Sequence, residues 1–74
     1  MTLDTLKPGE SAELVEILGC NGLRRRLLEL GLTPGTHISI VRVAPMGDPI
    51  ELKVRGYRLS LCRREAAQIT CRAA

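Results

Sequence analysis

The sequence is short of the residues that most catalytic and nucleic-acid-binding sites need. It has no phenylalanine or tryptophan, one tyrosine (Tyr57) and one histidine (His37). Single-stranded nucleic acids are usually held by stacking bases on aromatic side chains, so such a surface is disfavoured. Acid–base catalysis needs several titratable groups at one pocket, and this chain offers dispersed carboxylates and no phosphate-cradling glycine motif. We therefore expect a protein that is not an enzyme.

The cysteines form no recognisable framework either. Cys20, Cys62 and Cys71 are odd in number, and none belongs to a Cys-x-x-Cys pair. Neither a disulfide scaffold nor a zinc ribbon is predicted, and reduced thiols without a cofactor are the expectation. A metal site needs several ligands in one place, so we predict none in the monomer. The exception left open is a weak surface site shared by two copies, in which His37 or a cysteine of each chain meets carboxylates of its neighbour.

Long apolar segments are absent as well. No run approaches the roughly 18 to 20 residues that a membrane helix needs, and residues 1–7 lack the pattern of a signal peptide. The expectation is a soluble, cytoplasmic protein without a membrane span. With 74 residues, 45% hydrophobic and 26% charged, the chain fits one domain over residues 1–74. Residues 38–74 carry a charge of +4 and residues 1–37 a charge of −1, which gives the net charge of +3. The basic second half could steer an acidic partner, a nucleic acid or an anionic membrane surface.

Residues 50–61 carry the clearest structural pattern. Apolar and charged residues alternate from Ile50 to Val54, as they do in a strand with one wet face. The alternation resumes at Tyr57, so a β-hairpin is predicted with its turn at Gly56, which tolerates positive φ. Tyr57 falls on the apolar side and is expected to pack in the core or at its rim.

The segment before this hairpin is predicted to be a shaped loop. Pro45, Gly47 and Pro49 prevent regular strand pairing, because proline lacks a donor and glycine favours turns. Such a loop would present Met46 and Asp48 with little conformational entropy left to lose on binding. These two residues are candidate partner-binding residues.

Two further strands are predicted over residues 11–18 and 36–44. The apolar positions change phase after Leu14 in the first strand and after Ile40 in the second. A phase change suits a β-bulge, which swaps the face that points inward in the bent strands of a small barrel. After the hairpin, a short helical turn is predicted over residues 63–68. A closing strand over residues 69–72 completes the sheet.

One convincing helix lies between these strands. Asn21 is a plausible N-cap, Gly31 is placed to end the helix, and Leu32 would fold back in a Schellman motif. The apolar stripe is Leu23, Leu27 and Leu30. The rest of the predicted core is Ile38, Ile40, Val43, Ile50, Leu52, Val54, Leu59 and Leu61. The fold class is thus mainly β, a small barrel of about five strands, with one α-helix inserted after the first strand.

Four ordered blocks of the sequence resemble the FeoA family, small cytoplasmic proteins associated with bacterial ferrous-iron uptake. The blocks are residues 7–10 (KPGE), 23–36 (LRRRLLELGLTPGT), 41–50 (VRVAPMGDPI) and 55–61 (RGYRLSL). The resemblance covers nearly the whole chain and implies an SH3-like barrel. It also implies that the protein acts together with FeoB, a membrane iron transporter with a cytoplasmic GTP-binding domain.

The expected function is that of a non-catalytic accessory or regulatory protein of ferrous-iron uptake. It would dock, as a monomer or weak homodimer, onto the cytoplasmic domain of a FeoB-like transporter, which would recruit it to the inner face of the membrane. Arg24 and Arg25 on the polar side of the helix are a second candidate contact pair, because exposed arginines pair with carboxylates. The alternative function is a small basic barrel that binds single-stranded nucleic acid. Whether docking activates, inhibits or scaffolds the transporter stays open.

Overall fold

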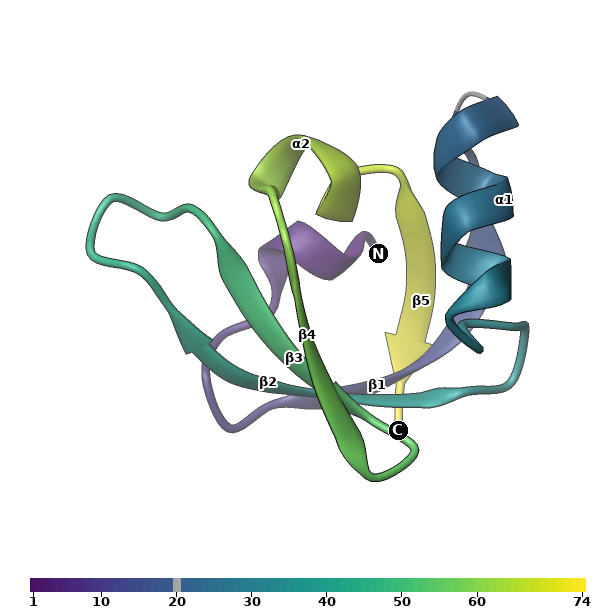
Figure 1. Cartoon of the computed structure of the whole chain (residues 1–74). Coiled ribbons are helices and arrows are strands. Elements are labelled where there is room, and N and C mark those ends of the chain that lie inside the picture. Colours follow the sequence, from purple (N-terminus) through teal and green to yellow (C-terminus); the bar gives the residue numbers. More distant parts are fainter. Residues whose placement is uncertain (20) are drawn as a thin grey trace.

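The chain folds into a five-stranded antiparallel sheet with helices at its margins in a computed structural model that describes residues 1–19 and 21–74 (Figure 1). The elements are a 3₁₀ turn η1 (Leu3–Thr5), β1 (Ser11–Ile17), α1 (Asn21–Glu29), β2 (His37–Val43), β3 (Ile50–Val54), β4 (Tyr57–Leu61), α2 (Arg63–Ala66) and β5 (Ile69–Ala73). The strand order is β4-β3-β2-β1-β5. The predicted mainly β class and its element order are therefore confirmed.

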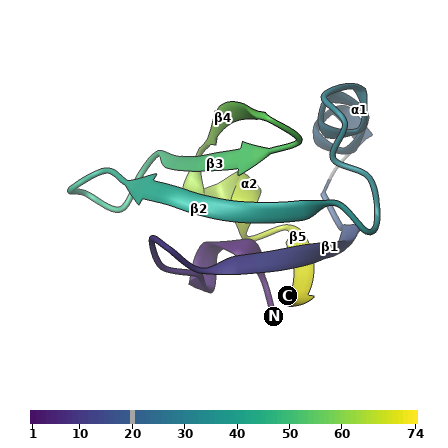
Figure 2. The same cartoon turned by 90° about the horizontal axis from the view of Figure 1, so that it is seen from below.

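The elements outside the sheet lie in distinct places. In both views η1 and α2 lie together on one side of β1, β2 and β3 (Figures 1 and 2). Helix α1 lies at one end of the sheet, and the loop between β2 and β3 projects from the opposite end. Among the described residues, no helix has both the length and the apolar character to cross a bilayer.

Both predicted phase changes are β-bulges. The pairing of β1 with β5 shifts register between Leu14 and Glu16, and that of β2 with β3 shifts between Ile40 and Arg42. Each bulge adds a residue to one strand, which bends the strand and exchanges its inner and outer faces. At the first bulge this leaves Val15 exposed while Leu14 is buried.

The β3–β4 hairpin also follows the prediction. Val54 pairs with Tyr57 across a two-residue turn in which Arg55 has φ 45° and Gly56 has φ 86°. Positive φ at both central positions is the mark of a type I′ turn, whose twist matches that of the flanking strands. Tyr57 is 36% exposed, so it packs at the rim and not in the core.

Helix α1 corrects one prediction. Leu23 and Leu27 are buried, but Leu30 is 42% exposed and lies beyond the end of the helix at Glu29. The chain reverses at Gly31, where the amides of Gly31 and Leu32 donate to the carbonyls of Leu28 and Leu27 in a Schellman motif. The buried position that the stripe assigns to Leu30 is therefore taken by Leu32. The helix begins at Asn21 itself, and the predicted cap by its side chain lies outside what the structure describes.

The core is otherwise close to the predicted set. Six of the eight predicted strand residues are buried, while Val43 and Leu59 are partly buried and pack against the core. Buried residues outside the predicted set are Leu3, Ala12, Leu14, Ile17, Leu32, Ala66, Ile69 and Cys71. Leu3 comes from η1, a turn too short to show periodicity in the sequence.

Glu65 connects the two helices. One carboxylate oxygen accepts the backbone N–H of Cys62 at 3.1 Å, and the other pairs with Arg26 of α1. Burial by itself raises the pKa of this carboxyl, but the hydrogen bonds from Cys62 and Arg26 outweigh it and hold the pKa below its usual value of 4.5. The ionised form of Glu65 is therefore favoured in the folded protein.

We expect Glu65→Gln to lower the free energy of unfolding at pH 7 by about 0.5–1.5 kcal/mol. The unfolded carboxyl has the higher pKa, so the stabilisation is full above pH 4.5 and is lost as the pH falls through the lower folded pKa. Urea denaturation at a series of pH values from neutral to acidic measures the difference from wild type. Glu16→Gln is the control, since Glu16 makes no ion pair within the described residues. A difference at Glu65 that stays constant in acid would contradict the linkage.

Candidate functional site

The structure separates the two predicted contact pairs. Arg24 and Arg25 lie on α1, at one end of the sheet, whereas Met46 and Asp48 lie in the β2–β3 loop at the other end (Figure 1). The molecule measures 29 × 23 × 23 Å, so the two ends do not form one small patch. They are two separate candidate surfaces.

The β2–β3 loop is held in place by Arg63. The Asp48 carboxylate accepts the backbone N–H of Arg63 at 2.9 Å, and the Arg63 side chain donates to the carbonyls of Gly47 at 2.9 Å and Asp4 at 3.1 Å. Asp48 therefore satisfies an amide in the first turn of α2. Met46 is 92% exposed. Of the two predicted residues, Met46 is exposed to solvent, while the Asp48 carboxylate is engaged within the fold.

A groove lies between α1 and β1. It encloses about 120 Å³ and is lined by Leu14, Val15, Glu16, Ile17, Arg24, Leu28 and Pro34. Two of its large apolar side chains, Val15 and Leu28, are exposed, as is Leu18, the residue that follows β1. We call this region, made of Val15, Leu18, Arg24, Arg25 and Leu28, the α1–β1 surface.

The three consecutive arginines of α1 have different roles. Arg26 is committed to Glu65, but neither Arg24 nor Arg25 makes an ion pair within residues 1–19 and 21–74. Arg24 also lines the apolar groove. An arginine beside exposed leucine and valine side chains can bind a carboxylate while its neighbours bury apolar area. Sequence reasoning found the arginines but missed Val15, although the phase change after Leu14 could have indicated it.

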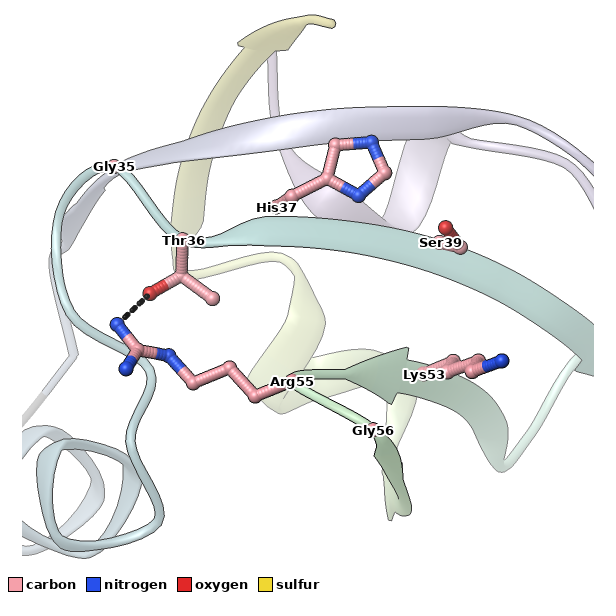
Figure 3. A pocket seen from close by; sticks show the side chains of 7 residues that line it. All are labelled: Gly35, Thr36, His37, Ser39, Lys53, Arg55 and Gly56. Carbon is pink, nitrogen blue, oxygen red and sulfur yellow. Dashed lines mark hydrogen bonds between the residues drawn. The ribbon is translucent and has the colours of Figure 1, made fainter.

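A second, polar hollow lies over β2 and the β3–β4 turn, and it contains the predicted His37. It encloses about 440 Å³ and is lined by Gly35, Thr36, His37, Ser39, Lys53, Arg55 and Gly56. Arg55 reaches back to donate to the hydroxyl of Thr33 at 3.3 Å. It also donates to the hydroxyl of Thr36 at 3.4 Å (Figure 3). Thr36 is itself buried.

The potential metal ligands of the described chain are dispersed. Residues 1–19 and 21–74 contain no group of three or more His, Cys, Asp or Glu side chains that could hold a metal ion. Cys71 is buried, which raises the pKa of its thiol, and Cys62 is partly buried beside α2. The expectation for Cys20 lies outside the described residues. The prediction of no metal site in the monomer stays a prediction, as does the shared site through His37.

These features together define the class. A bent five-stranded antiparallel sheet with two bulged strands and a helix inserted after the first strand is a small SH3-like domain. A model of the FeoA domain matches residues 1–73. The chain belongs to the FeoA family.

Individual relatives agree with this assignment. The solution structure of FeoA from Chlorobium tepidum is 41% identical, with a TM-score of 0.94, and the match covers 99% of this chain and 70% of that one. FeoA from Stenotrophomonas maltophilia, whose crystal structure is a zinc complex, is 33% identical with a TM-score of 0.81, over 96% of this chain and 88% of that one. A curated relative, the Fe(2+) transport protein A/Fe(2+) transporter FeoB fusion protein of Porphyromonas gingivalis, is 38% identical over 93% of this chain. The chain spans 8% of the length of that relative.

Proposed function

We propose that this chain is a non-catalytic, cytoplasmic accessory protein of ferrous-iron uptake that docks onto the cytoplasmic domain of a FeoB-type transporter. The observation that carries the proposal is the Porphyromonas gingivalis fusion, in which a FeoA-like segment and FeoB belong to one polypeptide. A covalent link holds two domains at a high effective concentration, so even a weak contact between them is populated. We propose that the domain described by this chain makes the same contact with the transporter's cytoplasmic domain.

The α1–β1 surface supplies the docking contact. Its groove is large enough for an apolar side chain, and exposed Val15 and Leu28 extend the apolar area around it. Arg24 and Arg25 add two positive charges that form no ion pair within the described residues, against the one carboxylate, Glu16, that lines the groove. The matching segment of the transporter is therefore acidic and carries an apolar side chain between its carboxylates. Docking there changes nucleotide handling or gating, or scaffolds the transporter.

Charge reversal on α1 is expected to weaken this docking. Arg24→Glu with Arg25→Glu should reduce affinity for the transporter's separated cytoplasmic domain by about tenfold or more at low salt. The loss should shrink as salt rises, because exposed charges are screened. Isothermal titration at low and moderate salt measures both effects.

The matched control changes the net charge equally at another place. Arg42→Glu with Arg58→Glu alters two exposed arginines of β2 and β4 that pair with Glu51 and lie off the α1–β1 surface. Equal losses for the two double variants would show that only net charge matters and would reject the surface. Leu28→Ser separates the apolar part of the contact, and its effect should persist at high salt.

The β2–β3 loop is the competing contact element. Since the Asp48 carboxylate is engaged with Arg63, Met46→Ala is a cleaner probe than a variant that also removes Asp48. Affinity equal to wild type for Met46→Ala would remove the loop from the docking site. Wild-type affinity for the α1 double variant, together with a loss for Met46→Ala, would move the site to the loop.

The nucleic-acid alternative is tested in parallel. Tyr57 is the single aromatic residue of the chain, and it lies at the rim of the core. Fluorescence polarisation with a single-stranded oligonucleotide at low and moderate salt should show weak binding that disappears with salt. Tight binding that survives moderate salt would favour the alternative.

A further inference from the structure

The polar hollow over β2 and the β3–β4 turn is rich in hydrogen-bond donors. Its five polar lining side chains are Thr36, His37, Ser39, Lys53 and Arg55. The Thr36 hydroxyl already donates to the carbonyl of Gly31 at 3.3 Å, and the Ser39 hydroxyl is hydrogen-bonded to that of Ser11 at 3.2 Å. The donors that remain for a ligand are therefore those of His37, Lys53 and Arg55. None of the lining residues is acidic. An environment of donors and positive charge without a carboxylate favours an anion.

The cationic side chains of the hollow, Lys53 and Arg55, form no ion pair within the described residues. Neither Lys53 nor His37 makes an ion pair in the part of the chain that the structure describes, and the contacts of Arg55 are with the hydroxyls of Thr33 and Thr36. The acidic residue opposite His37 in the strand pairing is Glu13, and its carboxylate accepts from Arg72 at 2.7 Å. The hollow therefore keeps its positive charge available to a ligand.

The backbone leaves room for this ligand. Gly35 and Gly56 line the hollow with positive φ, and a Cβ added to either would meet no atom within 4 Å. The left-handed turn at Arg55 directs its side chain back to Thr36 (Figure 3). Lys53 lies two residues before Arg55, across from Ser39 of β2, and in Figure 3 its side chain points away from Arg55. Rotation about the bonds of its long stem can bring the ammonium group over the hollow. The Arg55 guanidinium is thus held in place by hydrogen bonds, whereas the Lys53 ammonium group can change its position.

We infer that this hollow binds a phosphate group. Donors reach it from β2, from Lys53 and from Arg55, and a phosphate presents acceptor oxygens in three directions and up to two negative charges, whereas a carboxylate presents two oxygens in one plane. The site is open and partly flexible, so its affinity for inorganic phosphate lies in the millimolar range, about 1 mM. The ligand in solution is free phosphate or the phosphate of a nucleotide. The inference does not depend on the transporter.

Titration of ¹⁵N-labelled protein with inorganic phosphate, against sodium chloride at equal ionic strength, tests the site. Saturable shifts are expected at the amides of Gly35, His37, Lys53 and Gly56. Lys53→Gln should raise the dissociation constant by about tenfold, and Lys53→Arg should restore most of the affinity. Arg42→Gln is the control, because Arg42 is an exposed arginine of β2 that does not line the hollow.

A second variant separates binding from folding. Arg55→Asn removes the guanidinium but leaves an Asn-Gly turn, the pair that type I′ turns favour, so the hairpin should be at least as stable. Its dissociation constant should also rise by about tenfold. A nucleoside diphosphate serves as the second ligand. A lower dissociation constant for the diphosphate than for inorganic phosphate assigns the site to nucleotides. Equal dissociation constants assign it to free phosphate. Shifts that match those in chloride, or that Lys53→Gln and Arg55→Asn leave unchanged, would overturn the inference.

Discussion

Leu27→Ala is expected to lower the free energy of unfolding by about 2–5 kcal/mol, a large part of the stability of a domain of this size. Leu27 is 0% exposed and belongs to the cluster that joins α1 to the sheet. Truncation removes buried apolar atoms and leaves a cavity that the surrounding strands close only in part. Urea denaturation followed by circular dichroism measures the loss.

Leu30→Ala is the matched control for this prediction. The helical stripe in the sequence treats Leu27 and Leu30 alike, but the structure places Leu30 beyond α1 with 42% of its surface exposed. Its truncation should change the free energy of unfolding by about 0.5 kcal/mol or less. Equal losses at the two leucines would contradict this placement, and an unchanged midpoint for Leu27→Ala would reject its burial.

Gly31→Ala is expected to destabilise the protein by about 1–2 kcal/mol. Gly31 has φ 95°, a left-handed conformation in which a Cβ approaches the following carbonyl oxygen. Space is not the cause, because the added Cβ would meet the Tyr57 hydroxyl and the Arg55 side chain at 3.5 and 3.7 Å, ordinary contact distances. Thermal and urea denaturation should therefore report a loss that arises from the backbone.

Gly22→Ala is expected to stabilise the protein, in contrast to Gly31→Ala. Gly22 lies inside α1 without positive φ, it is exposed, and an added Cβ would meet no atom within 4 Å. Alanine restricts the unfolded chain and favours the helix, so the free energy of unfolding should rise by about 0.5–1 kcal/mol. Losses at both glycines would contradict the Schellman cap as the reason for the Gly31 effect.

Much of the fold could be predicted because its signals are local. The alternation through Ile50 to Val54, the glycine at the following turn and the two phase changes each depend on neighbours in the sequence, and each predicted feature is present. Period-2 patterning reports which strand face is buried, and a bulge is the way in which a strand changes that face. These features needed no knowledge of distant contacts.

The helix stripe shows where local periodicity stops being informative. Leu30 continues the spacing of Leu23 and Leu27, but the reversal at Gly31 ends the helical geometry and brings Leu32 inside instead. Leu3 is a second case, since a three-residue 3₁₀ turn is too short to show a period and its burial comes from packing. Chain reversal thus decided the exposure of Leu30, and packing decided the burial of Leu3.

For the candidate surfaces, too, the sequence supplied one part of the information and the tertiary structure the other. The sequence indicated the candidate residues, namely Arg24 and Arg25 of α1 and the constrained Met46–Asp48 loop, but it did not show which charged groups are paired within the fold. Glu65, far along the chain, binds only Arg26, and Arg63 similarly engages the Asp48 carboxylate. Which charged groups stay available to a partner depends on these distant pairings.

The sequence by itself determined the fold class and the position of the turns and bulges, because backbone sterics and hydrophobic periodicity act between near neighbours. It indicated the family through the resemblance of four ordered blocks of residues. The tertiary structure alone decided that the two predicted contact pairs lie at opposite ends of the sheet. It also decided that Val15 and Leu28 frame a groove with Arg24, and that His37, Lys53 and Arg55 surround one hollow. Burial, charge pairing and the meeting of side chains from different strands depend on how distant segments pack, and no local pattern carries that information.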